Sequence, residues 1–312
     1  MPDAIRAAVI GVGYLGAFHA EKYATLPGVE LVGVVDADAD RAAAIGAKVG
    51  APAIGRIEDL FGRIDCASIA VSTPAHFAVA SALLGHGIDV LVEKPITETL
   101  EEGRTLVDLA AQHGRILQVG HLERFNPAIR SLAGILTRPR FIECHRLAPF
   151  VERGTDVDVI LDLMIHDLDV ILSIVDAPIE RIEAVGVPVI SETVDIANAR
   201  LRFADGAIAN VTASRVALKR ERKIRFFQSD AYVSVDYGDR RVRICRRLTP
   251  AGGALPSIDV EEQSFGEADP LFDEIEAFVG AVRTRERPLV DGATALRALE
   301  AAERIVACLE TE

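Results

Sequence analysis

The sequence predicts an α/β protein with two domains: a doubly wound parallel sheet at the N-terminus, followed by an α/β domain built on an open, mainly antiparallel sheet. Three observations predict this fold. A glycine-rich turn follows the first apolar segment, strand-like and helix-like segments then alternate up to residue 120, and later strand-like segments are joined by short turns such as Asp205-Gly206. With 312 residues, 50% of them hydrophobic, the chain can bury two cores.

The alternation in the first part of the chain defines a complete doubly wound unit. We expect strands at residues 7–10, 30–35, 66–71, 89–93 and 116–120, and helices at residues 17–26, 76–85 and 100–113. The chain changes character over residues 120–127, where a strand ends in polar residues and a proline. We therefore place the domain boundary there, with residues 1–122 in the first domain and residues 123–312 in the second.

The segment Gly11-Val12-Gly13-Tyr14-Leu15-Gly16 fits the pattern G-x-G-x-x-G between a strand and a helix. Gly11 permits a tight turn, Gly13 lets the backbone approach a pyrophosphate, and Gly16 lets the helix lie close to the sheet. Tyr14 and Leu15 lie at the helix N-terminus, whose amides attract phosphate. This pattern predicts a Rossmann-type dinucleotide site.

Asp36 follows the second strand at the distance expected of a ribose-binding acid. A carboxylate there accepts hydrogen bonds from the adenosine ribose and repels a 2′-phosphate, and Asp38 and Asp40 add negative charge before Arg41. The sequence therefore favours NAD over NADP.

Two further segments end strands at the same carboxyl edge of the predicted sheet. Ser72-Thr73-Pro74 is expected to line the ribose or nicotinamide side of the cofactor site, and His76 after it is interpreted as a helix-start residue near the cofactor. Glu93-Lys94-Pro95 closes the strand at residues 89–93, and the fixed φ of Pro95 gives Lys94 a stiff mount. A lysine at this edge is a candidate for chemistry.

The second domain is expected to contain seven strands, at residues 141–147, 182–187, 195–203, 207–214, 223–228, 231–237 and 240–246. Helices are expected at residues 157–175, 270–284 and 294–309, and the last is long enough to pack back on the first domain.

The helix expected at residues 157–175 carries the second group of candidate residues. At 100° per residue, Asp162, His166 and Asp169 fall on one polar edge. Leu161, Ile165, Leu168 and Leu172 form a neighbouring apolar stripe that would seat the helix on the sheet. This arrangement directs an acid and an imidazole toward a cleft.

Together the glycine motif, Glu93-Lys94-Pro95 and Asp162-Leu163-Met164-Ile165-His166 resemble, in order and spacing, the family of glucose-fructose oxidoreductase and inositol dehydrogenase (Gfo/Idh/MocA) over nearly the whole chain. Residues 119–127, 154–158 and 161–167 more narrowly resemble nucleotide-sugar 3-dehydrogenases. The resemblance implies oxidation of a secondary sugar hydroxyl, foremost the 3-hydroxyl of UDP-N-acetylglucosamine, on the route to a diamino sugar of lipid A.

In the implied reaction, hydride passes to NAD and the hydroxyl proton passes to a side chain. His166, with a reference pKa of about 6.5, is our choice of base, Asp162 would orient its ring or relay the proton, and Lys94 would hydrogen-bond the reacting oxygen. We expect Glu93 to lie at the cofactor site. The expected substrate contacts are Lys94, His121, Arg124, Asn126, Arg153, Asp162, His166 and Asp169. Asp169 is equally well interpreted as an ordinary helix-face residue.

The basic segment at residues 215–225 leaves two interpretations open in a protein of net charge −13. It would bind a substrate diphosphate, or it would form a charged edge strand that resists aggregation. The sequence also leaves the identity of the substrate open: it could be a UDP-sugar, its uronate, myo-inositol or a free sugar. The alternative to an enzyme is a non-catalytic NAD-sensing regulator of the same fold.

Composition and charge exclude several other classes. The negative net charge argues against nucleic-acid binding, and no apolar run is long enough to insert in a membrane. The start of the chain shows no signal-peptide pattern, so we expect a cytoplasmic protein. Four scattered cysteines lack ligand spacing, so neither a metal site nor a disulfide framework is expected. An open sheet face must be covered, which predicts a homodimer or homotetramer.

Overall fold

The computed structural model describes residues 4–151, 157–248 and 257–309, which form two compact units. The first unit comprises the chain up to Leu122 together with Asp269–Leu296. The second comprises Glu123–Ala268 and the chain from Arg297 onward. The sequence predicted one boundary between the domains. The structure differs from this prediction at one point, because residues 269–296 return to the first unit after the second sheet is complete.

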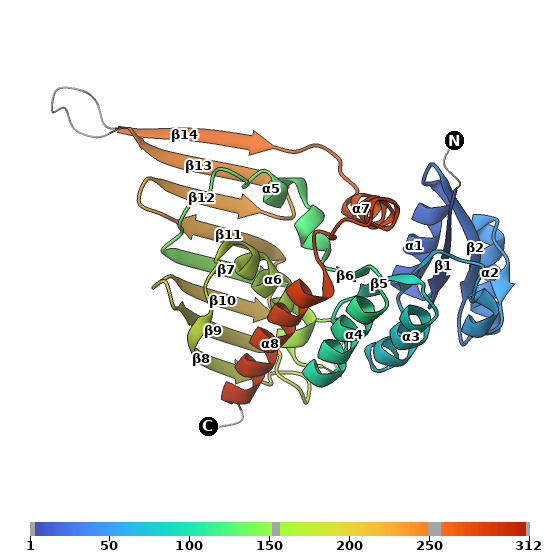
Figure 1. The fold of residues 1–312 in the computed structure, drawn as a ribbon. Coiled ribbons are helices and arrows are strands. Elements are labelled where there is room, and N and C mark those ends of the chain that lie inside the picture. The colour runs from blue at the N-terminus through green and yellow to red at the C-terminus, as the bar shows by residue number, and fades with distance from the viewer. Residues whose placement is uncertain (1–3, 152–156, 249–256, 310–312) are drawn as a thin grey trace. The chain divides into compact units, whose positions relative to one another are not determined.

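The first unit is built on a six-stranded parallel sheet with the order β3-β2-β1-β4-β5-β6 (Figure 1). The strand order reverses beside β1, and in such sheets ligands bind beyond the carboxyl ends of the strands at that point. The strands are β1 (Ile5–Ile10), β2 (Val29–Val35), β3 (Ala53–Ile54), β4 (Cys66–Ile69), β5 (Asp89–Glu93) and β6 (Leu117–Gly120). The helices between them are α1 (Tyr14–Thr25), α2 (Ala39–Val49), α3 (Thr73–Gly85) and α4 (Leu100–Gln112), with a 3₁₀ turn η1 (Ile57–Leu60).

Two helices of this unit begin three residues earlier than expected. Helix α1 starts at Tyr14, directly after Gly13, and α3 starts at Thr73 with a proline in its first turn. A proline is tolerated there because first-turn amides have no partner within the helix. Helix α4 follows the prediction closely, since Thr99 and Glu102 form a capping box at its start.

One face of the parallel sheet is covered by α1 and by α7 (Pro270–Thr284). Tyr23 of α1 and Ile275 and Phe278 of α7 are fully buried in the same cluster as Val9 of β1. Arg285, just past α7, also donates to both carboxylate oxygens of Asp89 at the start of β5. These contacts explain why the segment after the second sheet returns to the first unit.

The second unit contains an eight-stranded sheet with the order β14-β13-β12-β11-β7-β10-β9-β8 (Figure 1). All neighbours pair antiparallel except β7 and β10, which run parallel. The strands are β7 (Phe141–Leu147), β8 (Ile179–Val187), β9 (Ile196–Phe203), β10 (Ile208–Ser214), β11 (Glu221–Phe227), β12 (Ala231–Asp236), β13 (Arg241–Leu248) and β14 (Ser257–Ser264). The predicted fold class is confirmed, but β14 was not predicted.

Strand β11 lies in the interior of this sheet, between β7 and β12. The interpretation of residues 215–225 as a charged edge strand is therefore wrong. The edges are β14 and β8. An interior strand can carry these charges because the side chains of β11 alternate between the two faces of the sheet. Ile224 and Phe226 are fully buried, and the neighbouring Lys223 and Arg225 are partly exposed.

Helices pack on one face of the second sheet (Figure 1). They are the short turns η2 (Leu122–Phe125) and α5 (Pro127–Arg130), the π turn η3 (Ile160–Met164), α6 (Ile165–Ile174), and most of α8 (Gly292–Leu309). Ala298, Ala301, Ala302 and Ile305 of α8 belong to the core of this unit. The prediction that the last helix packs back on the first domain is wrong beyond Leu296, because its small apolar stripe is buried on the second sheet.

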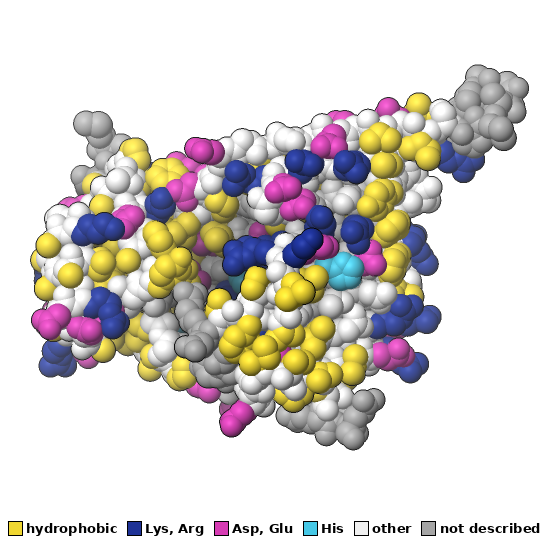
Figure 2. Space-filling view, turned by 180° about the vertical axis from the view of Figure 1, so that it is seen from behind, with side chains coloured by type: hydrophobic (Ala, Val, Ile, Leu, Met, Phe, Trp, Pro, Cys, Tyr) yellow, Lys and Arg dark blue, Asp and Glu magenta, His cyan; other side chains and the backbone are white. Residues whose placement is uncertain are grey.

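The opposite face of the second sheet is open in the single chain. Phe141, Phe227 and Tyr232 form a row of aromatic rings on it, with centroid distances of 5.4 and 4.9 Å. The view from behind shows apolar side chains lying beside basic and acidic ones on this unit (Figure 2). No helix among residues 4–151, 157–248 and 257–309 is long and apolar enough to cross a bilayer.

Candidate active site

The glycine turn after β1 has the geometry that the sequence predicts for a phosphate-binding loop. Gly11 has a φ of 82°, and a Cβ there would lie 2.7 Å from the backbone of Ala70. At Gly16 a Cβ would lie 1.8 Å from the Gly11 carbonyl oxygen, so helix and turn approach closely. Among the residues that the structure describes, none lies within 4 Å of a Cβ at Gly13, the N-cap of α1, and none caps this helix with its side chain. The free helix N-terminus beside an open glycine suits a pyrophosphate.

Asp36 fixes this loop from the end of β2. Its Oδ2 accepts a hydrogen bond from the Val12 amide at 2.8 Å, and its Oδ1 accepts one from the Asp38 amide at 2.9 Å. Arg41 also reaches Oδ1 at 3.3 Å, a contact that the sequence interpretation did not include. Tyr14 and Leu15 at the start of α1 stay 67% and 41% exposed, so apolar surface borders the loop.

Lys94 follows β5 between two anchored neighbours. The Glu93 carboxylate lies 2.9 Å from Nε2 of His19 and accepts from the Lys94 amide at 3.3 Å. On the other side, the Pro95 carbonyl oxygen lies 2.8 Å from Nδ1 of His76. The Lys94–Pro95 peptide bond is cis. These contacts fix the backbone on both sides of the lysine, in agreement with the stiff mount expected from Pro95.

The two histidines that anchor this edge are both buried. His76 Nε2 lies 3.1 Å from the Val71 carbonyl oxygen, so the ring lies between the ends of β4 and β5, and the nitrogen that carries the proton donates to one of the two carbonyls. Burial lowers the pKa of His76. His76 thus braces the site rather than presenting a nitrogen to the cofactor. Its neighbours Ser72 and Pro74 are exposed at the start of α3.

His19 was not identified from the sequence. Its Nδ1 lies 3.1 Å from the Ser68 hydroxyl, which lies 2.9 Å from the Tyr23 hydroxyl, so a buried polar chain runs from Glu93 into the core. Burial works against ionisation of Glu93, but His19 and the Lys94 charge outweigh it and lower the pKa of Glu93. The Lys94 charge is thus one of the groups that favour the carboxylate form of Glu93. No local pattern signals this pair, because 74 residues separate His19 and Glu93.

In the second unit, Asp162 and His166 lie on either side of a change in helix type. The expected continuous helix is a π turn over Ile160–Met164 followed by α6. Such turns are frequent at functional sites, and the wider turn changes which residues share a face. Asp162 and His166 are partly exposed, whereas Asp169 is 2% exposed. The apolar stripe starts at the buried Ile160 and Met164 instead of Leu161, and continues through Ile165 and Leu168.

Ion pairs hold η2 against α6. Nη1 of Arg124 lies 3.5 Å from the Asp169 carboxylate, so two expected substrate contacts face each other. Arg146 of β7 binds both oxygens of Asp167, at 2.7 and 2.9 Å, and also reaches Glu123 at 3.1 Å. Burial would lower the pKa of Arg146, but the charges of Asp167 and Glu123 outweigh it and raise it well above its usual value. This buried network fixes the position of Asp167, the residue next to His166.

The remaining expected contacts have different surroundings. Asn126 caps α5 by accepting from the Ala128 amide at 3.1 Å, and its amide donates to Glu123 at 3.3 Å. His121 follows β6 in the first unit and is 1% exposed. Arg153 lies outside the described residues.

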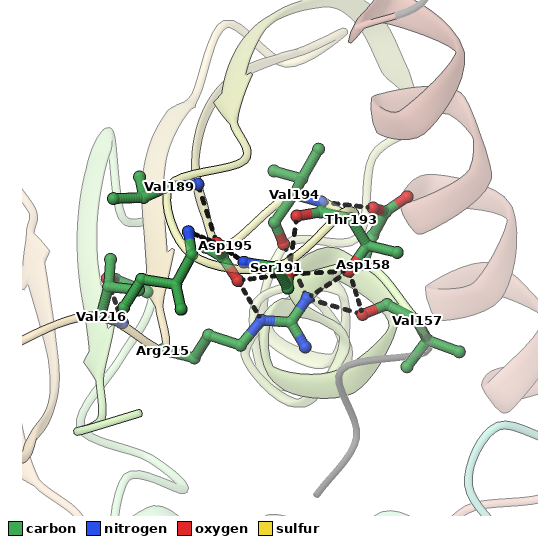
Figure 3. Close-up of polar contacts among 11 residues, drawn as sticks. Val157, Asp158, Val189, Ser191, Thr193, Val194, Asp195, Arg215 and Val216 are labelled. Carbon is green, nitrogen blue, oxygen red and sulfur yellow. Dashed lines mark hydrogen bonds and ion pairs between the residues drawn. The ribbon is translucent and has the colours of Figure 1, made fainter. Parts of the chain in front are cut away.

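Arg215 and Asp195 form a buried pair that anchors the start of the helical segment bearing Asp162 and His166 (Figure 3). Nε of Arg215 lies 3.0 Å from the Asp195 carboxylate, and Nη2 donates to the carbonyls of Val157 and Val194 at 2.7 and 2.9 Å. Asp158 in turn accepts from the Val194 amide at 2.9 Å. Arg215 therefore belongs to the scaffold of the site.

Removing the charge of Asp195 should leave the Arg215 guanidinium buried without its counter-ion. We expect Asp195→Asn to lower the free energy of unfolding by about 3–5 kcal/mol in urea denaturation. The control is Glu58→Gln, which removes one carboxylate from the exposed pair with Arg56 and should leave the free energy of unfolding close to that of wild type. Equal stabilities of the two variants would contradict the role of Asp195.

The effect of Asp195 should also depend on pH. Burial opposes its ionisation, but the amides of Val189, Ile190 and Ser191 and the Ser191 hydroxyl outweigh this and hold the pKa of Asp195 well below its usual value. A carboxylate with a depressed pKa stabilises the fold above its unfolded pKa of about 3.9 and loses this effect as the pH falls through the folded pKa. The stability difference between wild type and Asp195→Asn should be complete at pH 6 and shrink below about pH 4.

Comparison with known proteins places this geometry in a family. Residues 5–121 match the model of the oxidoreductase family with an NAD-binding Rossmann fold, and residues 129–234 match the Gfo/Idh/MocA C-terminal domain. The chain belongs to the Gfo/Idh/MocA family. The family predicted from the motifs is thus confirmed, and the protein is an NAD-dependent oxidoreductase.

Similar proteins include sugar and polyol dehydrogenases. UDP-N-acetylglucosamine 3-dehydrogenase of Acidithiobacillus ferrooxidans is 38% identical over 308 residues, covering 98% of this chain and 97% of that protein. A solved structure of that enzyme has a TM-score of 0.93 at 37% identity and covers 99% of this chain and 98% of its own. The scyllo-inositol 2-dehydrogenase of Bacillus subtilis is 28% identical, over 93% of this chain and 90% of its own.

The residues of the first unit fit the NAD cofactor. Gly13 leaves room for a pyrophosphate at the uncapped N-terminus of α1, and Asp36 stands at the end of β2 where a ribose hydroxyl would bind. When bound, NAD supplies the hydride acceptor.

Proposed function

We propose that the protein oxidises the 3-hydroxyl of UDP-N-acetylglucosamine to the 3-keto sugar, with NAD as hydride acceptor. The supporting observation is the 38% identity to a UDP-N-acetylglucosamine 3-dehydrogenase over nearly the full length of both chains. The inositol dehydrogenases match at lower identity, 28% in the case of the scyllo-inositol enzyme. The keto product would be a precursor of the diamino sugar of lipid A.

In this proposal His166 accepts the proton of the reacting hydroxyl, and Asp162 orients the imidazole. The π turn, which contains Asp162 and directly precedes the helix that bears His166, supports this assignment, because both side chains are partly exposed while Asp167 and Asp169 are buried. Lys94 donates a hydrogen bond to the reacting oxygen and stabilises the alkoxide character that develops there. The Lys94 charge acts on the Glu93 carboxylate and lowers the pKa of Glu93, which supports this donor role over a role as base.

Other expected contacts enter the proposal residue by residue. Gly11, Gly13, Gly16, Asp36, Ser72 and Thr73 would bind the cofactor, with Tyr14 and Leu15 flanking it. His121, Arg124 and Arg153 would contact the sugar. The Arg124–Asp169 pair would offer the substrate a guanidinium that is already oriented by a buried carboxylate.

The direct test is an NADH absorbance assay with UDP-N-acetylglucosamine, its uronate, free N-acetylglucosamine and myo-inositol. We expect the highest kcat/KM with UDP-N-acetylglucosamine. A higher value with another compound of the panel would move the proposal to that substrate. No NADH from any of them would favour a non-catalytic regulator that retains NAD binding.

We also propose that a second copy of the chain covers the open face of the eight-stranded sheet, giving a homodimer or homotetramer in the cytoplasm. The aromatic row of Phe141, Phe227 and Tyr232 supports this assembly, since exposed apolar patches mark interfaces. All four cysteines are free, as in a reducing compartment. Sedimentation should give a mass of two or four chains, and a monomer at micromolar concentration would contradict the proposal.

A further inference from the structure

The structure divides the basic residues of the segment 215–225 into two groups. Three form ion pairs: Arg215 with Asp195, Lys223 with Asp236 at 3.5 Å, and Arg225 with Glu143 at 2.7 Å. Within the part of the chain that the structure describes, Lys219, Arg220 and Arg222 have no acidic side chain within ion-pair distance. The segment therefore carries positive charge that the fold itself does not neutralise.

Arg220 and Arg222 line a hollow of about 510 Å³ at the start of β11 and the end of β12. Its volume lies in the range of small-molecule sites. One acid in its wall already has a basic partner, because Asp236 pairs with Lys223 and accepts from the amides of Gly238 and Asp239 at 3.1 Å. Glu221 lies 3.9 Å from the His145 imidazole, which carries no permanent charge. The wall thus holds three basic and three acidic side chains, so an anion would bind at the two arginines and not in a uniformly basic hollow.

The hollow opens at the end of the sheet from which the segment bearing His166 starts. Arg222 stands opposite Arg146 of β7 in the strand register, so both side chains leave the same face, the one that α6 covers. Arg146 binds Asp167, the residue next to His166. Glu221, Leu147, Ser214 and Ile196 are register partners along one row, and Asp195, which anchors the helical segment, immediately precedes Ile196 in the chain.

Charges of both signs surround Arg222. Partial burial of its guanidinium and the charges of Arg146 and Arg220 lower the pKa of Arg222, whereas the charges of Glu123 and Asp167 act in the opposite direction. Both of these carboxylates already bind Arg146. Like charges held together in this way are relieved by a bound anion. Two arginine forks match the oxygens of adjacent phosphates, which a neutral polyol lacks.

We propose that Arg220 and Arg222 bind the diphosphate of a nucleotide-sugar substrate and so select such a substrate over a free sugar or polyol. This inference rests on the proposed function, because it places the diphosphate on the same face of the sheet as the candidate base. The uridine would lie farther along the hollow. Of the six basic residues in the segment 215–225, only these two are thus proposed to bind the diphosphate.

The test compares Arg222→Gln with Arg104→Gln, which removes the same charge from an exposed position on α4. Loss of charge-assisted hydrogen bonds should raise KM for UDP-N-acetylglucosamine about tenfold to a hundredfold, with kcat changed by less than about threefold. The inhibition constant of UDP should rise by the same factor. The dissociation constant of NAD should not change, and Arg104→Gln should match wild type in every measurement.

Arg220→Gln provides a second variant at an exposed position, in case Arg222→Gln does not fold. Unchanged KM and unchanged UDP inhibition in the folded variants would overturn the inference. Calorimetric titration with UDP separates it from the proposed function, since this measurement needs no turnover. Binding of UDP to wild type that is weakened in the variants supports the site even if UDP-N-acetylglucosamine is not oxidised, and absence of UDP binding to wild type overturns it.

Discussion

Replacing Lys94 by methionine should lower kcat for sugar oxidation by about a hundredfold to a thousandfold while NAD remains bound. Methionine keeps most of the length of the side chain but removes the donor that would stabilise charge on the reacting oxygen, and loss of one such donor has effects of this size. The backbone should not move, because Glu93 and Pro95 are held by His19 and His76. Steady-state kinetics and NAD titration measure the two quantities separately.

The control for this variant is Lys48→Met, which removes an ammonium from α2 where it pairs with Glu21 on the surface. Its kcat should equal that of wild type. Normal turnover by Lys94→Met, with NAD bound, would show that the lysine at the end of β5 has no part in the reaction.

Replacing His166 by asparagine should lower kcat by about a hundredfold to ten-thousandfold and remove its dependence on pH. The imidazole must be neutral to accept a proton, so the wild-type rate should rise with pH through the range in which imidazoles titrate. Asparagine keeps a hydrogen-bonding side chain of similar size but accepts no proton. A pH profile of kcat for wild type and variant provides the measurement.

His113→Asn is the matched control, since this imidazole is exposed after α4 in the first unit. It should leave both kcat and its pH profile unchanged. If His166→Asn kept the wild-type pH profile at a reduced rate, the base would be another group and His166 would act only by positioning the substrate.

The parts of the fold that could be predicted are those with local signals. The glycine turn, Asp36 and the apolar strands of the first unit depend on steric requirements within a few residues, and each lies where the sequence indicated. Alternation predicted the strands of the second sheet for the same reason. Strand β14 escaped prediction because it is exposed on both faces, and the only position in it that is not fully exposed is Gln263.

The features that could not be predicted depend on contacts between distant parts of the chain. The return of residues 269–296 to the first unit depends on burial of Ile275 and Phe278 against a sheet completed much earlier in the chain. The π turn at Ile160–Met164 has an ordinary helical sequence, but Val157 just before it is held by Arg215, 58 residues away in the chain. The interior position of β11 follows from its pairing with β7.

The same distinction applies to the candidate site. Motifs identified Lys94, Asp162 and His166, but the groups that support them came only from the structure. His19 supports Glu93, Arg146 supports Asp167, and Asp195 supports Arg215, and each pair joins residues at least 20 positions apart in the chain. Sequence patterns therefore indicate candidate residues for the chemistry more readily than they indicate the residues that hold these candidates in place.

The central claim is that the protein takes a hydride from C3 of the sugar of UDP-N-acetylglucosamine. It is tested most directly with substrate deuterated at C3, followed by mass spectrometry of the reduced cofactor. We expect one deuterium in each NADH formed and a slower turnover than with unlabelled substrate. Reduced cofactor without deuterium, or no reduced cofactor, would contradict the claim.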